Sequence, residues 1–407
     1  MRQKIKSLII VLSCLIAFMY SCKEDIHKVY GSDGKAPGKV MIDNVDNKPG
    51  GAILHYTTPN DVDLLYVKAV FNDHTGRQRE YKTSAVIDSL VIEGIGAEGN
   101  YDVSVYAVDR GENVSEAATT VITPTTPPIK LVAPTLKGVA DYGGIKVSYK
   151  NDVEATVALN LLAYDADLNK MLFKESFYTT QKAGDYSFRG YRNVETKFGV
   201  YIEDRWGNKS DTTLFNVTPI PDDPLDKGKF SIFRIQGDKD FGAQATFAAE
   251  QMWDDEVNSQ WNCGHTDFST SLPHHLTIDL GAFVKLSRFK LFQRTGGELY
   301  KHGNPKRFKV YGTKDVNTLP PYNADDPNAG WTFLSEFNSF KPSGLPVGMT
   351  TVEDEEYQIK GEDFEFKPDN LQEIRYIRFE ILENWGGQNV SVIGELSFWG
   401  EILNSDI

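Results

Sequence analysis

Few residues in the sequence have the types and spacing that catalysis needs. Cys263 and His265 could act as nucleophile and base, but a pair two residues apart in a loop is a weak signal, and a buried thiol is the simpler interpretation. Glycoside hydrolysis needs two carboxylates that flank one cleft, whereas Asp254, Asp255 and Glu256 are consecutive. The seven histidines are scattered, and no serine elbow, His-Glu-x-x-His, phosphate loop or dinucleotide motif occurs. The sequence therefore predicts a protein that is not an enzyme.

Composition and charge exclude other classes of protein. At about 150 residues per domain, a chain of 407 residues predicts two to three domains. Hydrophobic residues make up 40% and charged residues 25% of the chain, which excludes a disordered tail, a collagen and a multispan membrane protein. The formal net charge of -14 argues against a nucleic-acid partner. The three cysteines are too few for a disulfide scaffold or a thiolate zinc site.

The N-terminus predicts export followed by anchoring. Basic residues 1–6 precede the apolar run 8–20, which is too short to span a bilayer, so we expect residues 1–21 to be a signal peptide. The serine before Cys22 resembles the cleavage site of bacterial lipoproteins, and residues 23–25 resemble the signal that sends Bacteroidetes lipoproteins to the cell surface. The resemblance implies that Cys22 is lipidated and holds the protein on the outer membrane, facing the exterior. The alternative is a soluble secreted protein whose cysteine is incidental.

The mature chain begins with a tether and continues with β structure. Residues 22–35 have little to bury and are expected to be flexible. Short alternating runs follow between turn signals, at 52–56, 64–71 and 101–108. Period-2 alternation at this spacing predicts an all-β sandwich.

An internal repeat organises residues 36–222 of the chain. The Gly-Gly pair at Gly50 recurs at Gly143, an offset of 93 residues. The segment that begins with Asp109-Arg110 recurs at Asp204, an offset of 95 residues. Two offsets that nearly agree indicate a duplicated domain.

The duplicated segments have the features of a known module. Proline-rich joints close the two copies at residues 123–128 and 218–224, and such joints act as stiff spacers. The length, the strand rhythm and the alternating strand at 101–108 resemble fibronectin type III modules. We therefore expect two tandem immunoglobulin-like (fibronectin type III-like) sandwiches, at 36–126 and 127–222.

A third domain is expected at residues 228–402. Its β runs lie at 276–280, 289–292, 307–311 and 375–381. In the last run Ile377 and Phe379 share one face, which we expect in the core. Arg378 and Glu380 share the other face, which we expect in solvent.

The motifs of this third domain carry a resemblance. In order they are 249–255, Trp261, 274–281, 289–294, 304–312, Trp331, 375–380 and 393–400. This series resembles the discoidin, or coagulation factor type C, domain, an eight-stranded jelly roll that includes carbohydrate-binding module family 32. With the lipoprotein signal and the two preceding modules, the arrangement resembles surface lipoproteins of Bacteroidetes polysaccharide utilisation loci. It implies an all-β protein without catalytic activity that binds glycans.

The resemblance also implies a structural calcium ion near one end of the jelly roll. Asp254 and Glu395 stand at the positions of its carboxylate ligands, and oxygen ligands from two distant segments suit a hard cation. Asp254-Asp255-Glu256 stands where the family commonly has Asp-Gly-Asn, so the choice of carboxylate stays open. The alternative is a solvated acidic turn without metal.

The resemblance places a sugar site on the loops at one end of the domain. Trp385 is the expected exposed stacking platform, with a loop-packing tryptophan as the alternative. Arg294 matches a position where sugar-binding relatives have arginine, with a surface salt bridge as the alternative. Further ligand-binding candidates are His265, Tyr300, His302 and Asn384. Three other tryptophans are expected to fill core or edge positions: Trp253, Trp331 and Trp399.

Three functions follow from these observations. The first is a surface lipoprotein that captures a poly- or oligosaccharide for a neighbouring outer-membrane transporter complex. One sugar ring at roughly 0.3 kcal/mol per atom binds only near millimolar, so many anchored copies would act together on a polymer. The second is a protein-binding accessory or adhesin lipoprotein, which a flat apolar patch on a fibronectin-like module would favour. The third is a hydrolase with a cryptic site.

Overall fold

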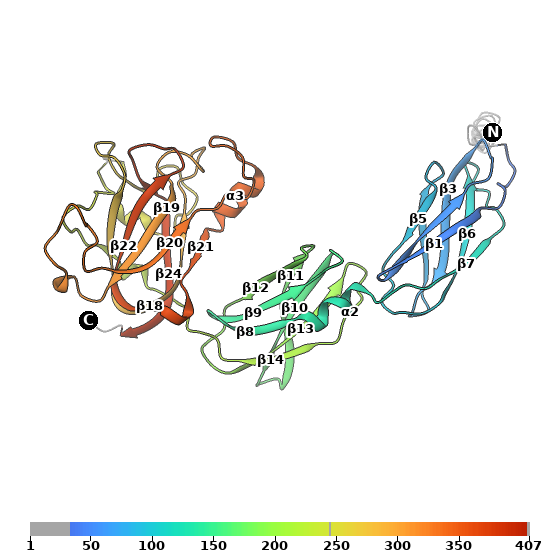
Figure 1. Cartoon of the computed structure of the whole chain (residues 1–407), viewed down its shortest axis with the longest axis horizontal. Helices are drawn as coiled ribbons and strands as arrows, with labels where there is room; N and C mark the ends of the chain where they lie inside the picture. The colour runs from blue at the N-terminus through green and yellow to red at the C-terminus, as the bar shows by residue number, and fades with distance from the viewer. Residues whose placement is uncertain (1–32, 244–245, 405–407) are drawn as a thin grey trace, which may run out of the picture. The chain divides into compact units, whose positions relative to one another are not determined.

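The computed structural model describes residues 33–243 and 246–404 (Figure 1). The expected signal peptide 1–21, the lipidation site Cys22 and most of the tether 22–35 lie outside the described residues. Helices in the described ranges are too short or too polar to cross a membrane. The predicted all-β fold is confirmed, since antiparallel sheets contribute nearly all the regular structure.

The first sandwich is built from two sheets. Its strands are β1 (Met41–Lys48), β2 (Gly51–Thr57), β3 (Leu64–Asn72), β4 (Gln78–Ser84), β5 (Ser89–Ile92), β6 (Tyr101–Asp109) and β7 (Ala118–Ile122). One sheet has the order β1-β2-β5 and the other β4-β3-β6-β7. Alternate residues of these strands, such as Leu54, Val67 and Val105, form the core between them.

The second copy repeats this strand order. Its strands are β8 (Lys137–Asp141), β9 (Gly144–Lys150), β10 (Val157–Asp165), β11 (Lys170–Thr179), β12 (Ala183–Phe188), β13 (Thr196–Asp204) and β14 (Thr213–Val217). They form sheets of order β12-β9-β8 and β11-β10-β13-β14. A short helix α2 (Pro128–Val132) and a 3-10 turn η1 (Ala133–Thr135) precede them. The predicted domain boundaries stay a prediction, because the compact units of the chain divide within this copy.

The repeated sequence motifs have the same local structure in both copies. Asp109 accepts hydrogen bonds from the backbone N and side-chain Nδ2 of Asn113, both at 2.9 Å. Asp204 accepts the same two bonds from Asn208, at 2.9 and 2.8 Å. The second glycine of each pair is also required, since a Cβ on Gly144 would lie 1.8 Å from a carbonyl oxygen of the neighbouring strand. The duplication predicted from the sequence is therefore visible in the hairpins.

The C-terminal region, residues 223–404, forms a larger sheet system. Its strands are β15 (Asp223–Pro224), β16 (Ser231–Ile232), β17 (Gly264–His265), β18 (His274–Phe292), β19 (Pro305–Thr313), β20 (Thr332–Asn338), β21 (Glu362–Glu365), β22 (Glu373–Asn384), β23 (Val392–Ile393) and β24 (Glu395–Asn404). The main sheet has the order β15-β24-β18-β22-β19-β20, with β16 and β21 also paired to β18. Helix α3 (Val352–Ile359) and the 3-10 turns η2 (Lys227–Lys229), η3 (Ala249–Met252), η4 (Val316–Thr318) and η5 (Pro368–Asn370) complete the region.

Strand β18 joins two runs that the sequence suggested as separate strands. Between 276–280 and 289–292 the chain continues in β structure, and the register with β22 shifts between Asp279 and Val284. Gly281 lies at this point with a φ of +68°, and a Cβ there would lie 2.6 Å from Lys229. The glycine therefore lets one long strand bend without ending.

The core of the C-terminal region centres on Phe289. Its ring contacts those of Phe364 at 5.1 Å, Phe337 at 5.4 Å and Phe379 at 5.5 Å between centroids. Apolar residues of β18, β22 and β24 surround this group. The strands whose ends carry the candidate loops therefore pack around one group of aromatic rings.

The expectation that Arg378 and Glu380 face solvent was wrong. Arg378 is fully buried, and Glu380 is 9% exposed. Arg378 Nη1 donates to Asp238 and, at 2.8 Å, to Thr277 Oγ1, and its guanidinium lies 5.5 Å from the ring of Trp331. Segments before β18 and before β20 cover this face of β22, so both faces of the strand are interior.

Candidate functional site

An aromatic and imidazole cluster forms at the loop end of β18 and β19. Phe247 stacks between Trp261, at 6.3 Å and 18°, and His265, at 4.9 Å and 12°. Phe268 approaches His265 at 5.9 Å and His302 at 5.8 Å. Trp261 is 59% exposed and Phe268 52% exposed. These five residues are called the ring cluster below.

Local backbone structure positions the two histidines. His265 lies in β17, where it pairs with Val392, and the adjacent Gly264 leaves room for the side chain of Met252. His302 has a φ of +48° in the turn before β19. Its carbonyl accepts a hydrogen bond from the backbone N of Gly386 at 2.9 Å. The loop after β22 therefore holds the turn that presents His302.

The two imidazoles form a hydrogen bond that fixes their tautomers. Nε2 of His265 lies 3.0 Å from Nε2 of His302, and Nδ1 of His265 lies 2.6 Å from the carbonyl of Thr266. Since a carbonyl only accepts, Nδ1 of His265 carries the proton and Nε2 of His302 donates. Burial lowers the pKa of both histidines, and the nearby Arg294 lowers both further. The pair is therefore neutral at physiological pH.

Arg294 completes the site beside the exposed ring. It lies two residues after the end of β18, is 7% exposed, and its Nε donates to the carbonyl of Gln260 at 2.6 Å. The guanidinium lies 5.3 Å from the ring of Phe247 and 5.4 Å from that of Trp261. Among the described residues no carboxylate forms an ion pair with it, so the salt-bridge alternative is not seen. An aromatic face with guanidinium and imidazole groups beside it can hold a ring that has one apolar face and carries hydroxyls at its edge.

Three other candidates form a separate group that supports the loops. Tyr300 is fully buried, and its ring meets Trp385 edge-on at 5.1 Å. Trp385 is half-buried and donates from its indole N–H to Ser339 Oγ at 3.3 Å. Asn384 is 5% exposed and donates to the carbonyls of Gln388 and Val390, both at 2.7 Å.

These contacts show how that group is held. Tyr300 and Asn384 are as buried as His265 and support the neighbouring loops, and ligand binding by them stays a prediction. Trp385 packs in its loop, whereas Trp261 presents the exposed ring that was expected there. Phe247 and Phe268 were missed, although aromatic residues within polar loop sequence were a usable signal. For Arg294, His265 and His302, ligand binding stays a prediction.

The residues expected to bind calcium lie near one another, at the 254–255 turn and at the start of β24. Glu395 is fully buried, and among the described residues no donor reaches its Oε2. Lys227 Nζ contacts Oε1 of Glu395 and lies 2.6 Å from Asp255 Oδ1. Both oxygens of Asp254 accept from Nδ2 of Asn262, at 2.8 and 3.0 Å. An orphaned buried carboxylate oxygen fits a cation ligand, so calcium held by Glu395 with Asp254 or Asp255 stays a prediction.

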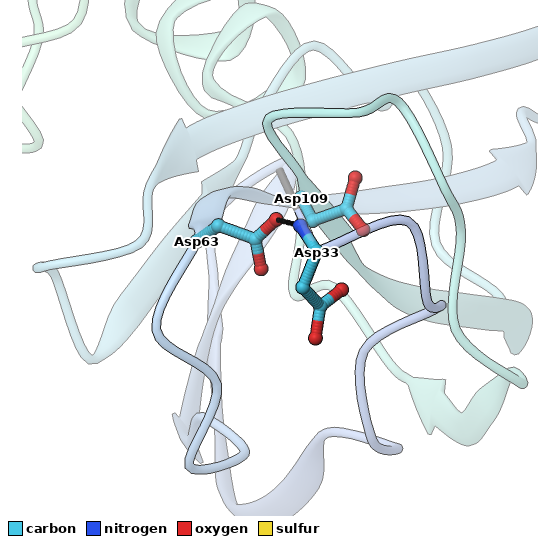
Figure 2. A group of neighbouring side chains, drawn as sticks. All are labelled: Asp33, Asp63 and Asp109. Atoms are coloured by element: carbon cyan, nitrogen blue, oxygen red, sulfur yellow. Dashed lines mark hydrogen bonds between the residues drawn. The ribbon is translucent and has the colours of Figure 1, made fainter. Parts of the chain in front are cut away.

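A second acidic group lies in the first sandwich. Ligand atoms of Asp33, Asp63 and Asp109 lie within 4.8 Å of one another (Figure 2). The backbone N of Asp33 donates to Asp63 Oδ2 at 3.0 Å. Asn113 occupies both oxygens of Asp109. Because these loop hydrogen bonds already use the carboxylates, we assign the group no ligand.

Cys263 does not form a catalytic pair with His265. The thiol is fully buried, and burial raises its pKa to about 11, which leaves it protonated and unreactive.

The three tryptophans expected at core or edge positions are found there: Trp253 and Trp331 are 7% and 9% exposed, and Trp399 is half-buried, with the guanidinium of Arg288 3.9 Å from its ring.

Family models match three consecutive parts of the chain. Each is described as a domain of unknown function, and they cover residues 37–124 (DUF4959), 125–228 (DUF5126) and 253–400 (DUF5000). A comparison with curated proteins finds no match.

Several solved structures are similar to parts of the chain. A SusE-like protein has 28% identity over 68% of this chain and 100% of its own, with a TM-score of 0.43. The family 32 carbohydrate-binding module of C. perfringens NanJ, solved with galactose, has 16% identity over 44% of this chain and 98% of its own, with a TM-score of 0.30. The C-terminal domain of a Bacteroides fragilis chitobiase has 20% identity over 45% of this chain and 100% of its own, with a TM-score of 0.31.

Proposed function

We propose that this protein is a non-catalytic surface lipoprotein that binds glycans through the loops of its C-terminal discoidin-like domain. It captures a poly- or oligosaccharide for an outer-membrane uptake system. The observation that carries the proposal is the ring cluster with Arg294 beside it. Here an exposed indole face stands next to neutral imidazoles and a guanidinium that forms no ion pair within residues 33–243 and 246–404.

The chemistry of the cluster suits a sugar better than a charged ligand or a peptide strand. The apolar face of a pyranose ring stacks on an aromatic ring, while its hydroxyls both donate and accept hydrogen bonds. Arg294 offers donors, whereas the N–H groups of the two neutral imidazoles are already used, one by the Thr266 carbonyl and one between the rings. A single ring bound this way gains about 4 kcal/mol, so function depends on many sites acting on one polymer.

The remaining parts of the proposal concern the setting of this site. A lipid on Cys22 holds the protein on the outer membrane, with the C-terminal domain facing the exterior. Transfer of the captured glycan to a transporter complex follows from that position. Calcium at Glu395 would tie the 254–255 turn to β24, close to the loops that form the site.

Affinity electrophoresis of the mature chain tests the proposal. A panel of soluble polysaccharides is cast in native gels, and Trp261→Ala is run beside the wild type. We expect retardation by one glycan class and a loss of at least about tenfold in apparent affinity for the variant. The matched control is Phe333→Ala, which removes a ring that is 52% exposed on β20 and outside the ring cluster.

Two results would contradict the proposal. If no polysaccharide retards the folded chain, glycan capture loses its support and a protein partner becomes the better hypothesis. If Trp261→Ala and Phe333→Ala behave alike, the chain binds glycan elsewhere and the ring cluster is not the site.

A further inference from the structure

The second sandwich carries a groove on the outer face of its sheet β11-β10-β13-β14. The strands of this sheet can be followed in Figure 1. The groove has a volume of about 530 Å³ and is lined by residues of three adjacent strands. Across its floor, Asn160 of β10 is paired with Ser176 of β11 and with Tyr201 of β13. In the next row, Ala158 is paired with Tyr178 and with Glu203.

Aromatic rings form the walls of this groove. Tyr178 is 73% exposed and Phe173 is 56% exposed, both on β11. Tyr201 rises from β13 on the opposite side and is half-buried. The small side chain of Ala158 lies between the strands that carry Tyr178 and Tyr201. Large side chains on the outer strands and small ones on the middle strand make the sheet face hollow.

The floor of the groove is polar although it lies low on the sheet. Asn160 is 4% exposed, and its Oδ1 accepts a hydrogen bond from Ser176 Oγ at 2.5 Å. Its Nδ2 has one long contact within the described part of the chain, at 3.4 Å with the carbonyl of Ala158. The groove therefore offers an amide donor and a hydroxyl beneath aromatic walls.

The first copy of the repeat shows that this groove is not a necessary property of the module. Its β3 places Lys68 opposite Tyr106 of β6, the same register that pairs Asn160 with Tyr201. Lys68 Nζ lies 5.9 Å above the Tyr106 ring, so a long charged side chain covers the equivalent floor. Tyr66 stands in that strand where the second copy has alanine.

We propose that this groove is a second saccharide-binding site, which rests on the proposed function of the chain. Its volume lies within the range of about 300–1,000 Å³ of small-molecule sites. Glu203, Asp204 and Arg205 lie at the rim, and Lys209 is paired with Glu203 at 3.6 Å, so acidic and basic groups balance there and the groove suits an uncharged sugar. A protein partner would need a flatter surface of about 800 Å². The second copy is then a binding module as well as a spacer.

The test uses the full mature chain and the polysaccharide that retards it most. The double variant Phe173→Ala/Tyr178→Ala removes two exposed rings, so the fold should be retained. Tyr164→Ala is the matched control. Tyr164 is 41% exposed on β10, the strand that carries Asn160 of the groove floor, but it does not line the groove. Trp261→Ala is run alone and combined with the double variant.

We expect the double variant to lose at least about tenfold in apparent affinity, and the combined variant to lose retardation completely. A double variant that migrates like Tyr164→Ala would refute saccharide binding in the groove. A loss of affinity in Trp261→Ala would still support the proposed function. Retardation that persists in Trp261→Ala and disappears only with the double variant would support the groove and refute the loop site. If no glycan retards the wild type, both fail, and the exposed rings become a protein-docking face.

Discussion

Replacing Glu362 with glutamine tests the interior that supports the candidate loops. Glu362 is 2% exposed and accepts hydrogen bonds from the backbone N of Phe340 and, at 2.6 Å, from Ser339 Oγ. Ser339 Oγ also accepts from the indole of Trp385. Burial raises the pKa of Glu362 from 4.5 to about 7, against the opposing effect of its hydrogen bonds.

The sign and the size of the expected effect follow from this pKa. Between pH 4.5 and about 7 the folded chain keeps a proton on Glu362 that the unfolded chain releases. The free energy of unfolding therefore falls as the pH rises through this window. A difference of about 2.5 pH units at about 1.36 kcal/mol each gives a loss of about 3 kcal/mol. Glutamine keeps the shape without the charge, so Glu362→Gln should not show this loss.

Urea unfolding followed by tryptophan fluorescence measures this difference. Five of the six tryptophans lie in the C-terminal region, so the signal reports its unfolding. The two proteins should be similar near pH 5, and Glu362→Gln should be more stable by about 3 kcal/mol near pH 8. Glu353→Gln, at an exposed position in α3, serves as the control. Parallel pH profiles for wild type and Glu362→Gln would refute the reasoning.

Three further predictions concern the site, the metal and the core. Glycan binding should weaken as the pH falls from about 8 to about 5, because protonation of His265 or His302, below their ordinary pKa of 6.5, breaks the neutral pair. Equal retardation at the two pH values would contradict this. Calcium should raise the melting temperature relative to EDTA in the wild type but not in Glu395→Gln, and an unchanged wild type would argue against the metal. Phe289→Ala should cost about 3–5 kcal/mol in urea unfolding, whereas a cost under about 1 kcal/mol would contradict its central place in the core.

The fold was predictable because its signals are local. Alternation within 101–108 and 307–311 identified strands that the structure contains, and the Asp109 and Asp204 hairpins identified the repeat. Such patterns depend on residues close in sequence, where the period of a strand fixes which side chains are buried. The burial of Arg378 was not predictable in this way, because the residues that cover it, such as Asp238, are distant in the chain.

The candidate site was predictable only in part for the same reason. Arg294, His265 and His302 were identified, and the structure brings them together. The exposed ring beside them is that of Trp261, because Trp385 meets the buried Tyr300 edge-on. Which of two loop tryptophans is exposed depends on tertiary contacts that no local pattern encodes.

The attachment of the C-terminal region has a consequence for where a change in the chain would be felt. The chain enters through β15, whose Asp223 and Pro224 pair with Gly400 and Trp399 near the middle of β24. Glu395 begins the same strand beside the loop end, some five residues away, or about 17 Å. A change in the segment leading into β15 therefore acts first on the buried ion pair of Asp222 with Arg288, at 2.9 Å, and reaches the candidate loops only along the length of β24.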